Sequence, residues 1–554
     1  MKIKFLLLAF AAVVMFLGNS AEAQSVAITN ARIVTVSGST IQTGSVVIRD
    51  GLIEAVGADV RVPADARVID GTGLTVYPGL IDTASTLGMP APAGQQGGGG
   101  PGGGGAAAQR PPLDGISNYP VGLRPEFQAA DVFKSGDSQF EAVRNAGITT
   151  AVITGRTGIF TGASLVANLA GDRVSAMIIR SPASQNFSYR TIGGGQYPAS
   201  LIGTFSAFRQ LLHDAKRQQE IERLHAADPR GLRRPEADAS LTALYPVING
   251  QMPIVFNANT EREIVRTLDL AREFNLKAVI SGGHEAWKQA ARIKEQNVPV
   301  LVSLNFPKGT APSAPEADPD NLSTLRMRAE TPKGAARLVQ AGVKIAFQTG
   351  DLTNVNDVFT NLGYAIDEGL SADAALRAFT LSGAEIFGVD NLTGSVEKGK
   401  IANLVVTRGD VFAKERTVTH VIVDGKVFEQ KERPAAQPGR GRGPQGPGQP
   451  GQPSAASLGG TYSITIEVPG ESMPATLVIT STGTTFTGQL RTAMGNSEIQ
   501  NGRITGNSFS FSAVVPYGGV SINIDVTGSV TGNAISGTIN TDQGAVPFSG
   551  TRNP

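Results

Sequence analysis

The chain has 554 residues, with 48 lysines and arginines against 47 aspartates and glutamates, so its formal net charge is +1. This balance excludes the strong positive charge by which proteins attract nucleic acids or anionic membrane surfaces, and we expect no nucleic-acid partner. Cysteine is absent, which excludes disulfides, a thiolate nucleophile, cysteine metal sites and a lipid anchor on an N-terminal cysteine. A chain of this length has room for about two to four domains.

The N-terminal stretch has the three parts of a secretory signal peptide. A basic start at Met1–Lys4 precedes an apolar run from Phe5 to Leu17, and Ala21-Glu22-Ala23 offers small residues for cleavage. The apolar run is too short to cross a bilayer as a helix, which takes about 20 residues. We therefore expect residues 1–23 to be removed and the mature protein to be exported to the periplasm or the exterior, with no membrane span and no lipid anchor.

Two sets of short strands are expected, one near the start of the mature chain and one after the central region. Residues 24–75 alternate between apolar and polar, and Asp50-Gly51 between two apolar runs predicts a hairpin. Residues 390–430 show the same alternation, with turn pairs such as Asp424-Gly425.

The stretch Val76–Gly88 carries the most specific motif of the chain. It resembles the start of the first barrel strand in the amidohydrolase superfamily, closest to the imidazolonepropionase-like members, where the sequence runs Pro-Gly-x-Ile-Asp-x-His-x-His. Two histidines two residues apart on a strand point to one side and can bind one metal ion. Here these positions hold Ala84 and Thr86, and neither a methyl group nor a neutral hydroxyl replaces imidazole on zinc. The first-strand metal motif is therefore lost, while Asp82 matches the aspartate of the family.

The resemblance extends from Val26 to Glu429 and implies the fold. It implies an α/β architecture with a TIM-type (β/α)8 barrel over residues 76–389 and a small β-sandwich built from residues 24–75 and 390–430. An open, doubly wound sheet would show the same alternation of strands and helices, so only the family motifs favour the barrel. One departure is Asn403, where the family usually has aspartate.

Short apolar runs rich in β-branched residues predict six barrel strands after the first. These runs cover residues 148–154, 174–180, 253–258, 277–281, 298–304 and 343–349. One more strand stays unplaced, with residues 164–169 as the candidate. The glycine- and proline-rich residues 90–112 have little apolar mass and predict a disordered insertion on the active-site side of the barrel.

Apolar residues at helical spacing predict the helices between these strands. They cover residues 137–145, 201–224, 261–274, 285–296 and 334–341. Ser371 is the expected N-cap of another helix, which runs to about Phe387 and stops before Gly388. Residues 305–332 are rich in Pro, Ser, Ala and Asp and predict an extended loop.

The last part of the chain differs in composition. Residues 431–458 are rich in proline and glycine and predict a linker. Residues 459–554 consist of short alternating runs separated by turn pairs such as Gly506-Asn507, which predicts a separate antiparallel sandwich or small barrel. This β-rich domain contains no histidine, so a structural or binding role is expected.

Three further site positions follow from the resemblance. The fifth-strand histidine of the family is Asn257 here, and an amide oxygen ranks far below imidazole as a zinc ligand. His284 lies just beyond the sixth strand and is a candidate metal ligand or general base, with helix capping as the structural alternative. Asp351 follows the eighth strand one residue later than the aspartate of the family. The substrate- or metal-site candidates are therefore Asp82, Asn257, His284 and Asp351, and the candidates for catalysis are His284 and Asp351.

The chain has 4 histidines in all, whereas metal-dependent members of the family generally use about that many for the metal alone. A lone histidine on a helix or a sandwich strand is usually structural, which is the expected role of the other three: His213, His225 and His420.

Two functions remain open. The resemblance implies an exported hydrolase of a carbon–nitrogen bond in a small amide, in which a divalent metal ion would activate water. The alternative is a catalytically inactive barrel that binds a small molecule, or that forms a homo- or hetero-oligomer with a related amidohydrolase. The lost imidazole positions motivate this second hypothesis.

Overall fold

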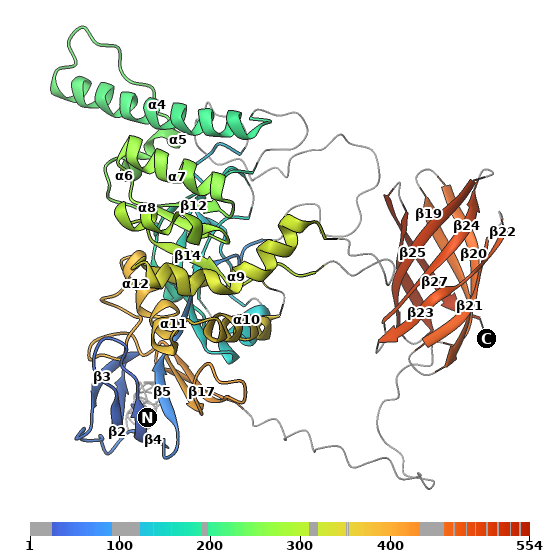
Figure 1. Ribbon diagram of the computed structural model, residues 1–554, viewed down its shortest axis with the longest axis horizontal. Helices are drawn as coiled ribbons and strands as arrows, with labels where there is room; N and C mark the ends of the chain where they lie inside the picture. The colour runs from blue at the N-terminus through green and yellow to red at the C-terminus, as the bar shows by residue number, and fades with distance from the viewer. Residues whose placement is uncertain are drawn as a thin grey trace, which may run out of the picture. The chain divides into compact units, whose positions relative to one another are not determined.

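The computed structural model describes residues 25–90, 122–136, 138–156, 158–171, 173–190, 198–309, 320–350, 352, 354–430 and most of 459–553. The expected signal peptide, residues 91–112 of the glycine-rich insertion, the linker 431–458 and the site candidate Asp351 lie outside these residues. The described residues form two compact units, one within residues 25–430 and one within residues 459–553 (Figure 1).

The strands that flank the central region join in one sheet of the first unit. Its eight strands follow the order β18-β17-β16-β5-β1-β2-β3, with β4 paired to β1. The contact between the two sets is antiparallel and places Leu404 opposite Pro78. Asp50 and Gly51 have φ angles of 52° and 79°, which fits the predicted hairpin turn. The strands are β1 (Val26–Ile33), β2 (Ile41–Arg49), β3 (Leu52–Gly57), β4 (Arg67–Asp70), β5 (Thr75–Pro78), β16 (Leu404–Arg408), β17 (Thr417–Val423) and β18 (Lys426–Glu429).

Two further sheets form the centre of the first unit. The first has the order β10-β9-β7-β6 and the second the order β15-β14-β13-β12-β11-β8. Neighbours run parallel from β11 to β15 and between β6 and β7. The strands are β6 (Leu80–Ser85), β7 (Ile148–Ile153), β8 (Phe160–Ala163), β9 (Leu165–Asn168), β10 (Ile178–Arg180), β11 (Gln185–Ser188), β12 (Ile254–Ala258), β13 (Ala278–Gly282), β14 (Val300–Ser303) and β15 (Ile345–Gln348).

The end strands of these two sheets, β6 and β15, are joined by side chains. Thr83 Oγ1 on β6 donates to the carbonyl of Phe347 on β15 at 2.7 Å. One buried cluster also draws apolar side chains from strands of both sheets, so the strands share a core. Its members on the strands are Ile81, Val152, Val166, Val255, Val279, Leu301 and Ala346.

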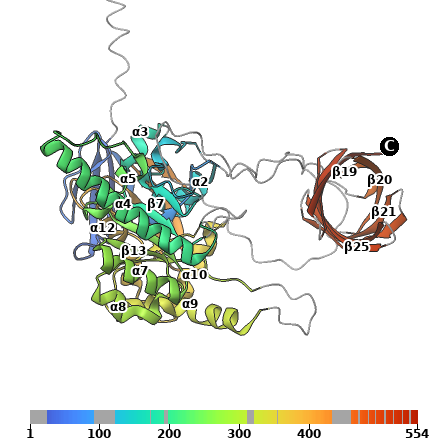
Figure 2. The same cartoon turned by 90° about the horizontal axis from the view of Figure 1, so that it is seen from above.

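Helices alternate with these strands, and Figure 2 shows α7, α8 and α9 grouped beside β13. Helix α7 illustrates the local cause: Thr260 and Glu263 form a capping box at its start, and its apolar face is buried. The helices are η1 (Ala129–Asp131), α2 (Ser138–Asn145), α3 (Val174–Met177), α4 (Leu201–Ala227), α5 (Ala239–Thr242), α6 (Tyr245–Ile248), α7 (Glu261–Phe274), η2 (Ala286–Gln289), α8 (Ala290–Glu295), α9 (Leu322–Gln340), α10 (Val355–Asp367), α11 (Ala372–Ala378) and α12 (Leu381–Ile386).

Three predictions about individual elements were wrong. Residues 174–180 form helix α3 and the short strand β10, because a brief apolar run does not by itself distinguish a strand from a helix. The predicted loop 305–332 gives way to α9 at Leu322, where Asn321 Oδ1 accepts from the Thr324 N–H at 2.9 Å, and α9 continues through Pro332. The helix capped by Ser371 ends at Ala378, and α12 follows as a separate helix.

The second unit is a closed antiparallel sheet. Eight of its strands pair in a ring, because β20 and β21 are hydrogen-bonded to each other as well as to β19 and β23, and β22 is attached to β21. Phe486, Phe509 and Phe511 are among the side chains of its core. The strands are β19 (Gly460–Val468), β20 (Glu471–Thr482), β21 (Thr485–Thr492), β22 (Gly495–Glu498), β23 (Gln500–Thr505), β24 (Ser508–Tyr517), β25 (Val520–Thr531), β26 (Ala534–Thr541) and β27 (Gly544–Arg552).

Among the described residues, no helix combines the length and the apolar character that a membrane crossing requires.

Candidate functional site

A cavity of about 310 Å³ opens at the carboxyl ends of the parallel strands, an end that we call the mouth. Its lining comes from the ends of β6, β11, β12, β13 and β15 and from the loop after β7. Most of the lining side chains are hydroxyl, amide or guanidinium groups. In parallel α/β folds this end of the strands is the usual place of the functional site.

Ala84 and Thr86, at the positions where the resemblance places two histidines, both line the mouth cavity. They stand two residues apart at the end of β6, as the motif predicts. The guanidinium of Arg156 donates from Nη2 to the carbonyl oxygen of Thr86 at 2.9 Å. A positive charge is therefore held at the strand end where the resemblance places a metal ion.

Asp82 is a buried residue with 1% of its surface exposed. Its Oδ1 accepts from the backbone N–H of Thr349 at 2.9 Å, and its Oδ2 accepts from the hydroxyl of Thr349 at 2.7 Å. The N–H of Ala84 also points to Oδ1, at 3.4 Å. These bonds tie the strand β6 to the residue that follows β15, which is a structural use of the carboxylate.

Asn257 lines the mouth cavity from β12. Its Oδ1 accepts from Asn259 Nδ2 at 3.3 Å, so the amide nitrogen is the atom that it can offer to a ligand. Beside it, Gln348 Nε2 donates to Ser281 Oγ at 2.9 Å and to the carbonyl of Leu301 at 3.1 Å. Ser281 keeps its own hydroxyl hydrogen for another acceptor.

His284 is not among the residues that line the mouth cavity. The chain leaves β13 through Gly282 and Gly283, whose φ angles are 93° and 62°, and a side chain at Gly282 would collide with Asn259 Oδ1. Burial lowers the pKa of His284, although a hydrogen bond to the backbone of Asn305 and the charge of Glu285 oppose the shift. Its buried Nε2 has no hydrogen-bond partner among the residues that the structure describes.

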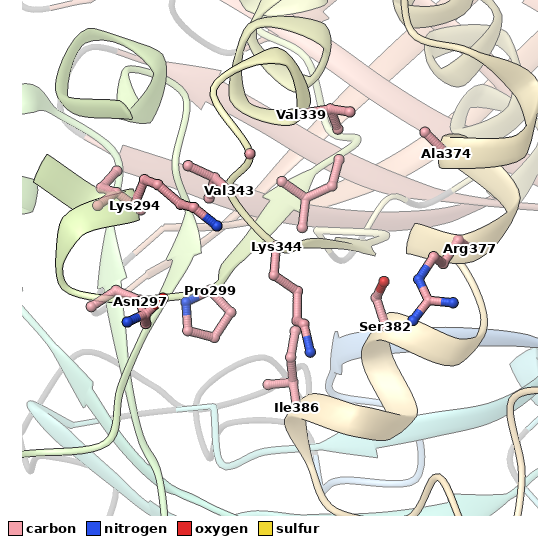
Figure 3. A pocket seen from close by; sticks show the side chains of 14 residues that line it. Lys294, Asn297, Pro299, Val339, Val343, Lys344, Ala374, Arg377, Ser382 and Ile386 are labelled. Atoms are coloured by element: carbon pink, nitrogen blue, oxygen red, sulfur yellow. The ribbon is translucent and has the colours of Figure 1, made fainter. Parts of the chain in front are cut away.

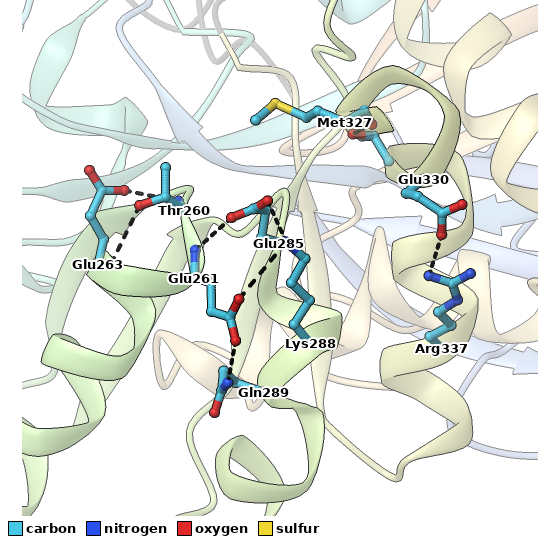
Figure 4. A network of polar contacts seen from close by, with 10 residues as sticks. Thr260, Glu261, Glu263, Glu285, Lys288, Gln289, Met327, Glu330 and Arg337 are labelled. Atoms are coloured by element: carbon cyan, nitrogen blue, oxygen red, sulfur yellow. Dashed lines mark hydrogen bonds and ion pairs between the residues drawn. The ribbon is translucent and has the colours of Figure 1, made fainter. Parts of the chain in front are cut away.

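Glu285, which follows His284 in the chain, and Glu261 are already paired with other groups, as Figure 4 shows. Glu285 Oε2 accepts from the N–H of Glu261 at 2.8 Å, and its Oε1 pairs with Lys288 Nζ at 2.7 Å. Gln289 Nε2 donates to Glu261 at 2.7 Å. This network fixes the start of α7 against η2 and offers no carboxylate to a metal ion beside His284.

The donor set that the described residues bring to the mouth does not fit a divalent cation. Among the described residues, no group of three or more histidine, cysteine, aspartate or glutamate side chains could hold a metal ion. The carboxylate of Asp82 is bound to Thr349, and the charged residues that line the cavity are Arg156 and Arg190. Guanidinium groups repel a cation and cannot ligate it. Asp351 lies outside the described residues.

Arg156 and Arg190 were not predicted as site residues. Neither forms an ion pair with an acidic side chain in the part of the chain that the structure describes. Arg156 follows the predicted strand β7 by a few residues, so its position just past a strand end was a usable signal. Arg190 follows β11, a strand that was missed because Gln185–Ser188 is mostly polar.

A larger cavity of about 560 Å³ lies at the opposite, amino ends of β14 and β15 (Figure 3). It also carries basic residues, among them Lys344 and Arg377. Both pair with one carboxylate, because Glu385 is 2.8 Å from Lys344 Nζ and 2.6 Å from Arg377 Nη2. Lys344 and Arg377 therefore have an acidic partner within the protein, which Arg156 and Arg190 lack in the described structure.

Residues 320–428 match the model of the Amidohydrolase family. Among solved structures, the chain is similar to an amidohydrolase from Thermotoga maritima MSB8, with a TM-score of 0.60 and 24% identity over 73% of this chain and 100% of that chain. A putative prolidase from Bifidobacterium longum has a TM-score of 0.43 and 19% identity, over 73% of this chain and 95% of that one. An adenosine deaminase from Xanthomonas campestris with bound zinc has a TM-score of 0.38 and 18% identity, over 73% and 92%.

No curated protein matches the sequence. The family match and the fold of the first of these structures confirm the resemblance to the amidohydrolase superfamily. At 24% identity the structural likeness shows the fold alone.

Proposed function

We propose that this amidohydrolase-type chain, a relative of carbon–nitrogen hydrolases, binds a small amide-bearing ligand at the mouth of a (β/α)8 barrel without the metal-activated water of that family. The family match over residues 320–428 supports the carbon–nitrogen hydrolase kind. The observation that carries the proposal is the donor set of the mouth cavity, where Ala84, Thr86 and Asn257 occupy the ligand positions and two arginines supply the charge.

Closure of the two central sheets into one barrel is part of this proposal. The shared cluster that includes Ile81, Val255 and Ala346 supports it, because side chains of strands far apart in a flat sheet would not meet. The hydrogen bonds from Thr83 and Thr349 that join β6 and β15 support it as well. A closed ring of strands holds the lining residues around one cavity.

The proposal is tested by elemental analysis of the purified mature protein after incubation with zinc, manganese and calcium and removal of excess ion. We expect no retained metal. The matched variant is Ala84→His with Thr86→His, which restores two imidazoles on one side of β6 and should gain zinc. Retention of about one ion per wild-type chain, lost on His284→Ala, would overturn the proposal.

A rebuilt hydrolytic site is the second candidate, and the family match favours it. The matched residues 320–428 include the end of β15, where Asp351 follows Gln348-Thr349-Gly350. In this candidate Asp351 or His284 acts as general base on water. Hydrolysis of N-acyl amino acids by the wild-type protein, abolished by Asp351→Asn, would favour this function over binding alone.

We also propose that residues 1–23 direct export and that the mature protein works in the periplasm or outside the cell. The basic start and the apolar run that follows it support this. The mass of the protein recovered from a periplasmic extract tests it, with cleavage after Ala23 as the expected result. A related amidohydrolase as partner subunit is a further proposal, tested by the mass of the complex that the mature chain forms with such a protein.

A further inference from the structure

The mouth cavity has the opposite charge to a metal site. Among the residues that the structure describes, its lining includes Arg156 and Arg190 and no aspartate or glutamate. Because neither arginine is paired with an acid in the described structure, the described part of the lining has an excess of positive charge.

Building on the proposed binding function, we propose that the mouth cavity binds the anionic oxygen group of a small ligand, a carboxylate or a phosphate, between Arg156 and Arg190. Guanidinium is the side chain that pairs with such groups through two parallel hydrogen bonds. The anion would stand where the resemblance places the metal ion of the family.

Two separate strand ends supply the two arginines. Arg156 lies in the loop after β7 and is held by its bond to the carbonyl of Thr86, so one edge of its guanidinium is fixed in place. Arg190 follows the end of β11, and its N–H donates to Ser188 Oγ at 3.3 Å. Since β7 and β11 belong to different sheets, residues far apart in the chain bring two cations to one cavity.

Neutral donors at the base of the cavity match the same ligand. Asn257 has its amide oxygen bound to Asn259 and can present its nitrogen to an acceptor. Ser281 is 6% exposed and accepts from Gln348, which leaves its hydroxyl hydrogen to donate. An anion needs donors only, and these two side chains are oriented by their other bonds to act as donors.

The cavity volume of about 310 Å³ fits a small molecule rather than a polymer segment, since ligand cavities start at about this size. Both arginines are exposed residues, so the attraction is partly screened by water and salt. We therefore expect binding that weakens as the salt concentration rises.

Calorimetric titration of the full mature chain tests the proposal with three probes: N-acetylglycine, its neutral amide N-acetylglycinamide, and inorganic phosphate. We expect an anion to bind and the neutral amide to bind at least about tenfold more weakly. Arg156→Gln and Arg190→Gln should each weaken anion binding about tenfold, and the double variant should abolish it. Arg61→Gln, at an exposed arginine outside the cavity, is the matched control and should bind as the wild type does.

The two anions distinguish a carboxylate ligand from a phosphorylated one. Stronger binding of N-acetylglycine assigns the cavity to carboxylates, and stronger binding of phosphate assigns it to phosphorylated ligands. Equal binding of the acid and its amide, no heat from either anion at millimolar concentration, or unchanged binding in the double variant would each overturn the proposal. Unchanged thermal unfolding of the variants shows that a loss of binding is not a loss of fold.

Failure of the anion-binding proposal can be distinguished from failure of the proposed function. If the wild-type protein retains metal and loses anion binding on chelation, the binding function without metal is wrong. If no metal is retained and the neutral amide binds equally well with or without the arginines, only the assignment of an anionic ligand is wrong.

Discussion

Charged side chains at the two ends of the parallel strands differ in whether they are paired within the protein. At the amino ends, Lys344 and Arg377 both pair with Glu385, and the buried Asn403 forms hydrogen bonds with Asn168 and Thr150. At the mouth, Arg156 and Arg190 line a cavity to which the described part of the chain contributes no carboxylate. Partners within the protein stabilise the fold, whereas groups left without them are available to a ligand, and this difference supports the proposal that the mouth is the binding end.

The largest effect on stability is expected at Asp82, a charged residue near the mouth that, unlike the two arginines, is paired within the protein. Asp82→Ala removes the acceptor of two Thr349 hydrogen bonds in a site that is 1% exposed. Because hydrogen bonds to a charged group contribute about 1.5–3 kcal/mol each, we expect the free energy of unfolding to fall by about 3 kcal/mol. Urea unfolding followed by the fluorescence of Trp287 measures it, because the chain has 1 tryptophan and that residue lies in the first unit.

Asp65→Ala is the control for this substitution, since Asp65 is an exposed residue whose side chain keeps 70% of its accessible surface. A drop of less than about 1 kcal/mol for Asp82→Ala, the size of an ordinary surface change, would contradict the structural role. The bonds between Asp82 and Thr349 would then contribute little to the stability of the fold.

The next effect concerns Asn403 at the amino end. Its Nδ2 donates to Asn168 Oδ1 at 2.7 Å and to Thr150 Oγ1 at 3.1 Å, and its Oδ1 accepts from the N–H of Asp424 at 2.9 Å. Asn403→Asp restores the residue usual in the family, yet it removes a donor and buries a carboxylate. We expect a loss of about 2 kcal/mol in the same unfolding experiment.

Asn249→Asp, at an exposed position, controls for the added charge. If Asn403→Asp were as stable as the wild type, the polar network at the amino end would tolerate an acid. The need for a hydrogen-bond donor would then not explain why this chain has asparagine where the family usually has aspartate.

These two residues show what the sequence could predict. The motif around Asp82 and the β-branched runs predicted β6, β7 and β12–β15, because buried parallel strands are apolar along their whole length. Helix α7 was predicted over the residues that it occupies, Glu261–Phe274, since its cap and its apolar period agree. The departure at Asn403 was visible in the sequence, but its reason needed the three partners that the fold brings together.

The rest of the site depended on contacts between distant segments. Strand β11 is mostly polar and gave no apolar signal, so Arg190 could not be placed at the mouth. The bond between Arg156 and Thr86 joins the segments that follow β7 and β6, and no local pattern predicts it. His284 was placed correctly just past its strand, yet the turn at Gly282-Gly283 keeps it out of the cavity lining.

A smaller effect is expected from the pH dependence of stability around His284. Burial lowers the pKa of His284 below its ordinary value of 6.5, so the unfolded chain takes up the proton first as the pH falls. The stability of the first unit should therefore decrease as the pH drops below about 6.5. His284→Gln should flatten this part of the curve, measured by urea unfolding of Trp287 fluorescence between about pH 7.5 and 5.5.

His225→Gln, at a histidine in the last turn of α4, is the control and should leave the dependence of stability on pH unchanged. A curve that is equally steep in His284→Gln would mean that other groups cause the acid sensitivity. His420, whose pKa burial also lowers, is the next residue to substitute in that case.

The smallest effect on stability is expected from Glu385→Gln, and it tests the comparison between the two ends most directly. The substitution leaves Lys344 and Arg377 without their acid beside the larger cavity. Because these are surface ion pairs, the free energy of unfolding should fall by only about 0.5 kcal/mol. If pairing is what distinguishes the two ends, Glu385→Gln in the Arg156→Gln, Arg190→Gln background should gain weak, salt-sensitive binding of inorganic phosphate by calorimetry. Absence of this gain would mean that unpaired positive charge is not sufficient, and that the oriented donors Asn257 and Ser281 make the mouth a binding site.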